Sequence, residues 1–197
     1  QATNKRSDAV ITNSKVFMPL KYSIYLAIYR HLSRDSQAKY YAKKSMFPTL
    51  DKYQLKEVDI VVSNYRENIA QYLRTIFPDD VLQLCPGFVT GLDDGLARFT
   101  LNHHFLFPYW DVNHKIIQAF NGRKRKVFGD GSRYQWLIDE RKFLYIPAEV
   151  SPANAMIITE GEKKAILATA MGIPTAAVAG VNCFDTPDTQ NEQLSKY

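Results

Sequence analysis

Apolar side chains recur at helical spacing in the first third of the chain. Between positions 18 and 32 they fall every three or four residues, at Leu20, Ile24, Tyr25, Ile28, Tyr29 and Leu32. Pro19 stands at the start of this run, where the first helical turn accepts proline best. Similar spacing predicts three further helices, at 35–44, at 64–76 with a start as early as 58, and at 79–84. We therefore predict a helical subdomain over residues 1–92.

Beyond residue 92 the pattern changes to short apolar runs separated by turns. Two apolar and aromatic runs, at 105–110 and 115–120, flank the polar residues 111–114, which predicts a β-hairpin. A third aromatic segment follows at 133–137. Residues 93–95, Asp-Asp-Gly, predict a turn, and we place a hinge between the two halves at 90–95. These features predict a mixed α/β subdomain over residues 93–150.

The last part of the chain has the alternation of a parallel β-α-β unit. An apolar run at 156–159 ends in Glu160 and Gly161, a helix-forming segment follows, and a second apolar run ends at Gly180. Groups at the carboxyl ends of strands face the ligand crevice of an open α/β sheet. We therefore predict that Glu160 carries chemistry and that Gly161 forms the tight turn. The alternative is that Glu160 is only an acidic residue stabilised by the dipole of the following helix.

Residues 159–165, Thr-Glu-Gly-Glu-Lys-Lys-Ala, resemble the opening of a TOPRIM domain, the metal-binding fold of bacterial-type primases, topoisomerases and some nucleases. Three upstream segments are similar to the catalytic core of bacterial-type, DnaG-like primases. They are Pro-Gly-Phe at 86–88, the hairpin with Phe-Pro and Gly-Arg at 105–123, and Arg-Tyr at 133–134. All four segments occur in the family's order. The chain thus resembles the DNA primase core of phage and mobile-element primase–helicases.

This resemblance implies an α/β (α+β) fold in which residues 151–197 form the N-terminal part of a TOPRIM domain. It implies that Glu160 is catalytic and binds Mg²⁺ or Mn²⁺, and carboxylate oxygens are the ligands that such hard cations prefer. The implied reaction is the synthesis of short primers by a nucleotidyltransferase during DNA replication. The implied partners are a single-stranded DNA template, nucleoside triphosphates and a replicative helicase in cis or in trans. The implied location is the cytoplasm or nucleoid of a host cell.

Two features depart from that family. A TOPRIM domain has a later strand ending in Asp-x-Asp, whereas Asp185 and Asp188 fall in a proline-broken stretch that we predict to be a loop. Arg133 stands where the family has lysine, and its planar guanidinium is not equivalent to a compact ammonium group. We therefore expect a truncated TOPRIM part, and we expect residues 1–197 alone to have little or no polymerising activity.

Basic residues gather just after the predicted hairpin. The chain has a net charge of +5, and the segment 121–133 contains Arg123, Lys124, Arg125, Lys126 and Arg133 against a single aspartate. Such a cluster is expected to bind phosphates of DNA or of a nucleotide, and Lys163 and Lys164 at the following helix start are candidates for the same role. Tyr134 and Trp136 are candidates for stacking on bases. The alternative is a solvated basic loop or a localisation signal.

Other classes of site find little support. Cys85 and Cys183 are a distant pair, and the adjacent His103 and His104 point to opposite sides of a strand, so we expect no zinc. No apolar run approaches the ~18 residues that cross a bilayer, so we expect no membrane partner. The chain also lacks a glycine-rich Walker loop.

Two other functions remain open at this point. The first is a DNA-binding accessory module of a replicative helicase, without catalysis. The second is a TOPRIM nuclease or topoisomerase, which fits less well because those proteins lack the hairpin upstream of the Glu-Gly turn.

Overall fold

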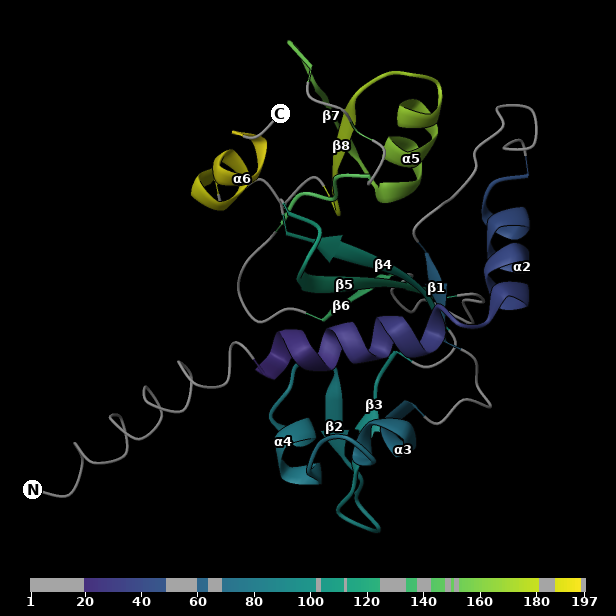
Figure 1. Ribbon diagram of the computed structural model, residues 1–197, viewed down its shortest axis with the longest axis vertical. Coiled ribbons are helices and arrows are strands. Elements are labelled where there is room, and N and C mark those ends of the chain that lie inside the picture. The colour runs from purple at the N-terminus through teal and green to yellow at the C-terminus, as the bar shows by residue number, and fades with distance from the viewer. Residues whose placement is uncertain are drawn as a thin grey trace, which may run out of the picture.

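The computed structural model describes residues 20–48, 60–63, 69–101, 104–111, 113–124, 134–137, 143–147, 150, 153–180 and 187–195. A four-stranded antiparallel sheet in the order β1–β4–β5–β6 lies at its centre (Figure 1). Its strands are β1 Val61–Val62, β4 His104–Trp110, β5 Ile117–Lys124 and β6 Tyr134–Leu137. Helices and two smaller sheets pack against it, which confirms the predicted mixed α/β class.

The long hairpin of β4 and β5 confirms the prediction from the two aromatic runs. Its turn is closed by Asp111, whose Oδ1 accepts hydrogen bonds from the backbone N–H groups of Lys115 and Ile116 at 2.7 and 2.8 Å. Aspartate is favoured in turns because its side chain satisfies nearby backbone donors in this way. Since successive residues of a strand point to opposite faces, the hairpin presents two different surfaces to the layers above and below it.

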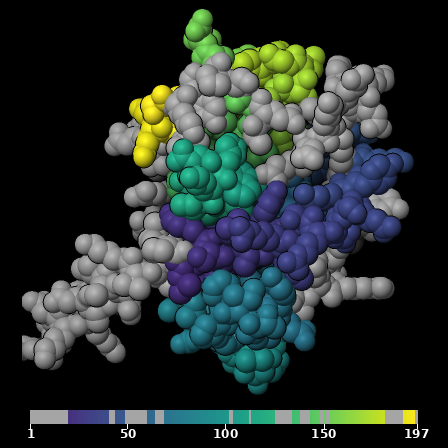
Figure 2. Space-filling model, viewed as in Figure 1, coloured from purple at the N-terminus to yellow at the C-terminus, as the bar shows by residue number. Residues whose placement is uncertain are grey.

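The N-terminal helix, residues 20–32, covers one face of the sheet and is drawn in purple across the middle of the molecule (Figure 1; Figure 2). Its apolar side is fully buried at Ile24, Tyr25 and Ile28. The Tyr25 hydroxyl donates a hydrogen bond to the carbonyl of Leu137 at 2.9 Å, and its ring meets Phe120 edge-on at 5.6 Å. The helical spacing in the sequence therefore predicted both this helix and its buried side.

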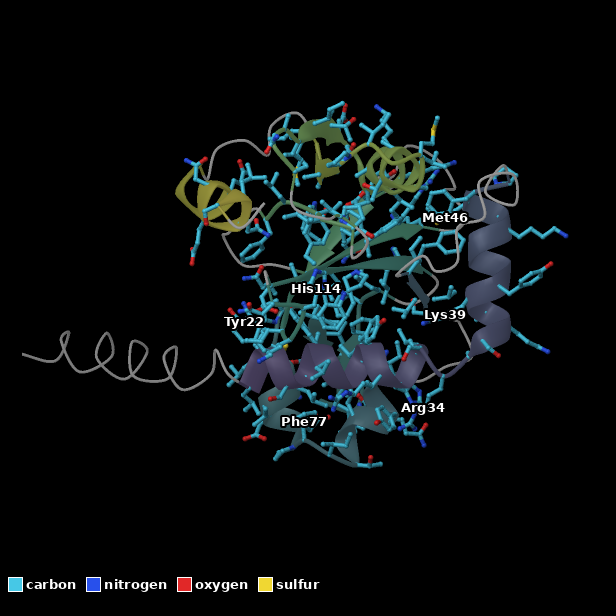
Figure 3. The ribbon with its side chains drawn as sticks, turned by 45° about the horizontal axis from the view of Figure 1, so that its top comes forward. Tyr22, Arg34, Lys39, Met46, Phe77 and His114 are labelled. Atoms are coloured by element: carbon cyan, nitrogen blue, oxygen red, sulfur yellow. The ribbon has the colours of Figure 1, made fainter. Side chains whose placement is uncertain are left out.

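A small layer lies on the far side of the N-terminal helix. It consists of α3 Ile69–Arg74, α4 Asp79–Gln83, β2 Phe88–Thr90 and β3 Ala97–Phe99. Asp79 of α4 links this helix to α3 and β3. Its carboxylate accepts hydrogen bonds from Arg74 Nε at 2.7 Å, from Gln83 Nε2 and from the backbone N–H of Ala97. Figure 3 shows Phe77 beneath the N-terminal helix, where it packs against the same apolar core.

The opposite face of the sheet is covered by α2 Ser36–Met46 and by a β-α-β unit. This unit consists of β7 Ile157–Glu160, α5 Glu162–Ala170 and β8 Thr175–Val178, with β7 and β8 parallel. Ala165 and Ile166 of α5 are buried in one cluster with Phe107 and Tyr109 of β4. Tyr145 bridges the two layers, since its backbone exchanges two hydrogen bonds of 2.8 Å with that of Ala177. The predicted strand–helix–strand pattern is thus confirmed.

Three local predictions are wrong. The earlier of the two expected helix starts, at 58, is wrong, because Val61 and Val62 form an edge strand beside β4; in the described residues the helix α3 is Ile69–Arg74. Segment 90–95 is the turn of the tight β2–β3 hairpin, closed by Gly91 N–H to the Leu96 carbonyl at 2.7 Å, and not a hinge between halves. The stretch predicted as loop, at 184–189, overlaps the start of α6, Pro187–Leu194, in which proline occupies the first helical position, while residues 184–186 lie outside the described part.

The apolar core on the N-terminal helix side combines residues from both predicted subdomains, from Ile24 to Leu137. The division at residues 92 and 150 stays a prediction. None of the helices in the described part of the chain is long and apolar enough to cross a membrane.

Candidate functional site

Glu160 is the last residue of β7 and is exposed at the carboxyl end of that strand. Ile157, Ile158 and Thr159 favour an extended backbone because they are β-branched. The chain then turns at Gly161, which has φ 86° and donates its N–H to the Val178 carbonyl at 2.7 Å. A positive φ of this kind is accessible to glycine at no steric cost. The local sequence therefore builds the turn that presents Glu160, as predicted.

Glu162, the first residue of α5, is buried, with 1% of its surface exposed, whereas Glu160 is exposed to solvent. Its Oε1 accepts a hydrogen bond from the Tyr109 hydroxyl at 2.6 Å and another from Asn121 Nδ2. Burial raises the pKa of this carboxyl above its ordinary value, while the two hydrogen bonds and the nearby Arg123 charge act to lower it. The two carboxylates of the Glu-Gly-Glu segment thus have different environments.

Sequence reasoning did not single out Glu162. A glutamate in the first turn of a helix is common, because the helix dipole favours negative charge there. The available signal was Asn121, a polar residue that directly follows the apolar pair Ala119 and Phe120 in β5 and that is 0% exposed in the structure. A buried amide in such a position needs a polar partner from another element, and here the partner is Glu162.

Arg123 lies on the face of the sheet that α5 covers. It pairs across the strands with Tyr134, and its guanidinium lies 5.9 Å from the centre of the Tyr134 ring. The next pair on this face is Asn121 and Trp136, and the Trp136 ring lies 4.6 Å from that of Tyr109. The structure therefore places Arg123, Tyr134 and Trp136 on one face of the sheet.

The two aromatic candidates differ in their exposure. Tyr134 is 37% exposed, whereas Trp136 is half-buried and packs against the apolar cluster under α5. Stacking on a base requires an accessible ring face. Tyr134 is therefore the better placed of the two.

The other residues predicted to bind phosphate have different environments. Lys124 follows Arg123 at the end of β5 and is half-buried. Lys164 is exposed on α5, while the Lys163 ammonium lies 5.7 Å from the ring centre of Phe47. Gly180 lies in a bend after β8. Arg125, Lys126 and Arg133 fall outside the described residues, so their predicted role is untested.

The carboxylate of Glu160, at the expected metal site, is exposed. The residues that the structure describes contain no group of three or more His, Cys, Asp or Glu side chains suited to holding a metal ion. Glu162 is directed into the protein and its carboxylate is occupied by Tyr109 and Asn121. Magnesium is commonly held by one or two carboxylates together with substrate phosphates, so Glu160 fits the role of one such ligand.

No protein-family model matches the sequence, and no curated protein is significantly similar to it. Solved structures are similar. The E. coli primase catalytic core matches with a TM-score of 0.59 and 17% identity, covering 81% of this chain and 55% of that one. The RNA polymerase domain of Mycobacterium tuberculosis primase DnaG, in complex with a double-stranded DNA oligomer with a 6-nucleotide overhang, matches with a TM-score of 0.58 and 13% identity, covering 84% and 55%. A DnaG primase catalytic domain bound to ssDNA matches with a TM-score of 0.52 and 15% identity, covering 81% and 57%.

The chain spans little more than half the length of these structures. At such low identities the likeness is one of fold. This chain therefore shares the fold of part of a bacterial primase catalytic core, and the predicted resemblance is confirmed at that level.

Proposed function

We propose that this chain is part of a DNA primase, which binds single-stranded DNA and joins nucleoside triphosphates into short primers. The observation that carries the proposal is the position of Glu160. It is exposed at the carboxyl end of a parallel strand, in a fold shared with primase cores. The sheet packed beneath α5 carries Arg123 and Tyr134, which suit a phosphate and a base.

In this proposal Glu160 supplies a carboxylate oxygen to Mg²⁺ or Mn²⁺. Such an ion, when bound, neutralises developing charge during the displacement at the nucleotide phosphate. Arg123 and Lys124 bind phosphates of the template or of the incoming nucleotide, and Lys164 adds positive charge at the start of α5. Tyr134 offers a ring face to an unpaired base. Lys163 has a smaller role, since its ammonium lies over Phe47.

Several finer points belong to the same proposal. The Glu-Gly turn would be the start of a TOPRIM domain, and the context would be a phage or mobile-element primase–helicase working with a replicative helicase in the cytoplasm. A single accessible strand-end carboxylate in the described part is a weak metal site. For that reason we expect residues 1–197 by themselves to have little polymerising activity.

The test is primer synthesis on single-stranded DNA with labelled nucleotides and Mg²⁺ or Mn²⁺. The complete protein would be compared with Glu160→Gln and with the control Glu192→Gln, which removes an exposed carboxylate from α6. We expect the control to keep activity and Glu160→Gln to lose it while still binding DNA. Unchanged primer synthesis in Glu160→Gln would refute the proposal.

The second candidate is a DNA-binding accessory module without catalysis. The shortage of clustered carboxylates in the described residues favours it. It predicts salt-sensitive DNA binding in all three proteins and no primer in any of them. The same experiment therefore separates the two functions.

A further inference from the structure

We propose that Glu162 is a positioning residue, whose buried carboxylate holds the Glu160–Gly161 turn against the sheet that carries Arg123. This inference rests on the proposed function. In that function the arrangement would keep the carboxylate of Glu160 close to the face of the sheet that carries Arg123. Glu162 itself is buried and has no access to a substrate.

β7, the strand that presents Glu160, has little apolar burial to hold it in place. Its residues Ile157 and Ile158 are 55% and 39% exposed, and in the described part of the chain β7 pairs with β8 alone. Burial of apolar side chains therefore contributes little to fixing this strand. The carboxyl end of β7 is connected to the rest of the protein in two ways. It pairs with β8, and it continues into the start of α5, where Glu162 is hydrogen-bonded to the central sheet.

Glu162 anchors the start of α5 to the central sheet. Tyr109 comes from β4 and Asn121 from β5, and both donate to the same oxygen of Glu162. Two donors from different strands restrict the position of the carboxylate more than a single hydrogen bond does. Only Gly161 separates Glu162 from Glu160, and its N–H is bonded to Val178. A displacement at Glu162 is therefore passed on to Glu160 through a short, constrained turn.

Glu162 is a charged type of residue at a buried position. Taking a carboxylate out of water is unfavourable, and well-packed apolar residues usually stabilise a buried position as well or better. Glu162, Tyr109 and Asn121 are each at most 1% exposed. Hydrogen bonds depend on direction as well as on distance, so this network restricts the geometry more than apolar contacts would. Asn121 lies two positions before Arg123 on the same face of β5, so the network joins the start of α5 to the strand that carries Arg123.

The experiment compares Glu162→Gln, Glu162→Leu and Tyr109→Phe in the complete protein. Gln keeps an oxygen that can accept from Tyr109 and Asn121, whereas Leu has a similar size and no acceptor. Glu192→Gln and Tyr40→Phe are matched controls on exposed helix positions. Hydrogen exchange of the backbone amides at 156–164 reports how firmly the turn is held. Mn²⁺ affinity by paramagnetic resonance, and kcat and KM for primer synthesis, report its consequence.

We expect exchange at 156–164 to be about tenfold faster in Glu162→Leu, nearly normal in Glu162→Gln and intermediate in Tyr109→Phe. Mn²⁺ affinity and kcat should fall in the same order, while DNA affinity and the KM for nucleotide change little. Unchanged exchange in Glu162→Leu overturns the inference, even if the protein is a primase. Faster exchange with unchanged Mn²⁺ affinity and kcat also overturns it, because Glu162 would then be only structural. A wild-type protein that makes no primer and binds no Mn²⁺ refutes the proposed function, and the positioning role with it.

Discussion

Gly87 allows a close approach between the β2 layer and the central sheet, and replacing it with alanine tests that packing. Gly87 has φ 98°, and its carbonyl accepts a hydrogen bond from the N–H of Thr100 at 2.8 Å. An added Cβ would lie 2.7 Å from both Cδ atoms of Leu137 and 3.1 Å from its Cγ. Leu137 is buried, and the Tyr25 hydroxyl binds its carbonyl, so neither its side chain nor its backbone can move away easily.

Two effects contribute to the expected destabilisation of Gly87→Ala. The positive φ costs an alanine roughly 1–2 kcal/mol, and overpacking of a filled core costs about 1–3 kcal/mol more. The expected loss is therefore about 2–5 kcal/mol. Gly95→Ala is a matched control, because Gly95 also has a positive φ, 68°, but no atom lies within 4 Å of its added Cβ. It should lose roughly the first amount only.

The assay is equilibrium unfolding in urea, followed by tryptophan fluorescence and by circular dichroism to check that the transition is two-state. The free energy of unfolding should fall by about 1–3 kcal/mol more in Gly87→Ala than in Gly95→Ala. Equal losses in the two variants would refute the packing argument. The result would then mean that Leu137 moves at little cost and that β6 is less firmly held than the structure indicates.

Three further outcomes are expected. Arg123→Ala should weaken binding to single-stranded DNA and reduce the slope of log affinity against log salt by about 0.7, the loss of one phosphate contact, measured by fluorescence anisotropy; an unchanged slope would argue against this contact. Tyr25→Phe should lower the free energy of unfolding by about 1–3 kcal/mol, because the buried carbonyl of Leu137 loses its donor, and a neutral urea-unfolding result would contradict this. Hydrogen bonding by Arg74 lowers the pKa of Asp79 from 3.8, so its contribution is present above that pH and lost as pH falls through the lowered pKa; the stability difference between wild type and Asp79→Asn should therefore shrink in acid, and a constant difference in unfolding at several pH values would exclude it.

Local sequence signals predicted several elements well. The alternating and turn residues of the hairpin, and the apolar spacing of the N-terminal helix, depend on neighbours in the chain, so they were visible without a structure. The errors arose where distant segments decide the outcome. Val61 and Val62 are extended because they pair with Leu106 and Phe105 of β4, and no nearby residue signals that pairing.

The candidate site shows the same division. Glu160 could be predicted because the strand, the glycine and the helix that present it are consecutive in the sequence. Glu162 could not, since its burial depends on Tyr109, 53 positions away, and on Asn121, 41 positions away. Arg123 was predicted to bind phosphate and Tyr134 to stack on a base, but their pairing across the strands is a result of strand register.

The sequence by itself determined the N-terminal helix, the β4–β5 hairpin, the β7–α5–β8 unit, the carboxylate after β7 and the basic character of the segment after β5. These follow from local propensity, side-chain periodicity and charge, which act over a few residues. Only the tertiary structure decided that α5 lies over the β4–β5 hairpin and that one glutamate of Glu-Gly-Glu is exposed while the other is buried. The physical reason is that burial and hydrogen bonding depend on which surfaces meet in space, and packing of the two layers on the central sheet settles that.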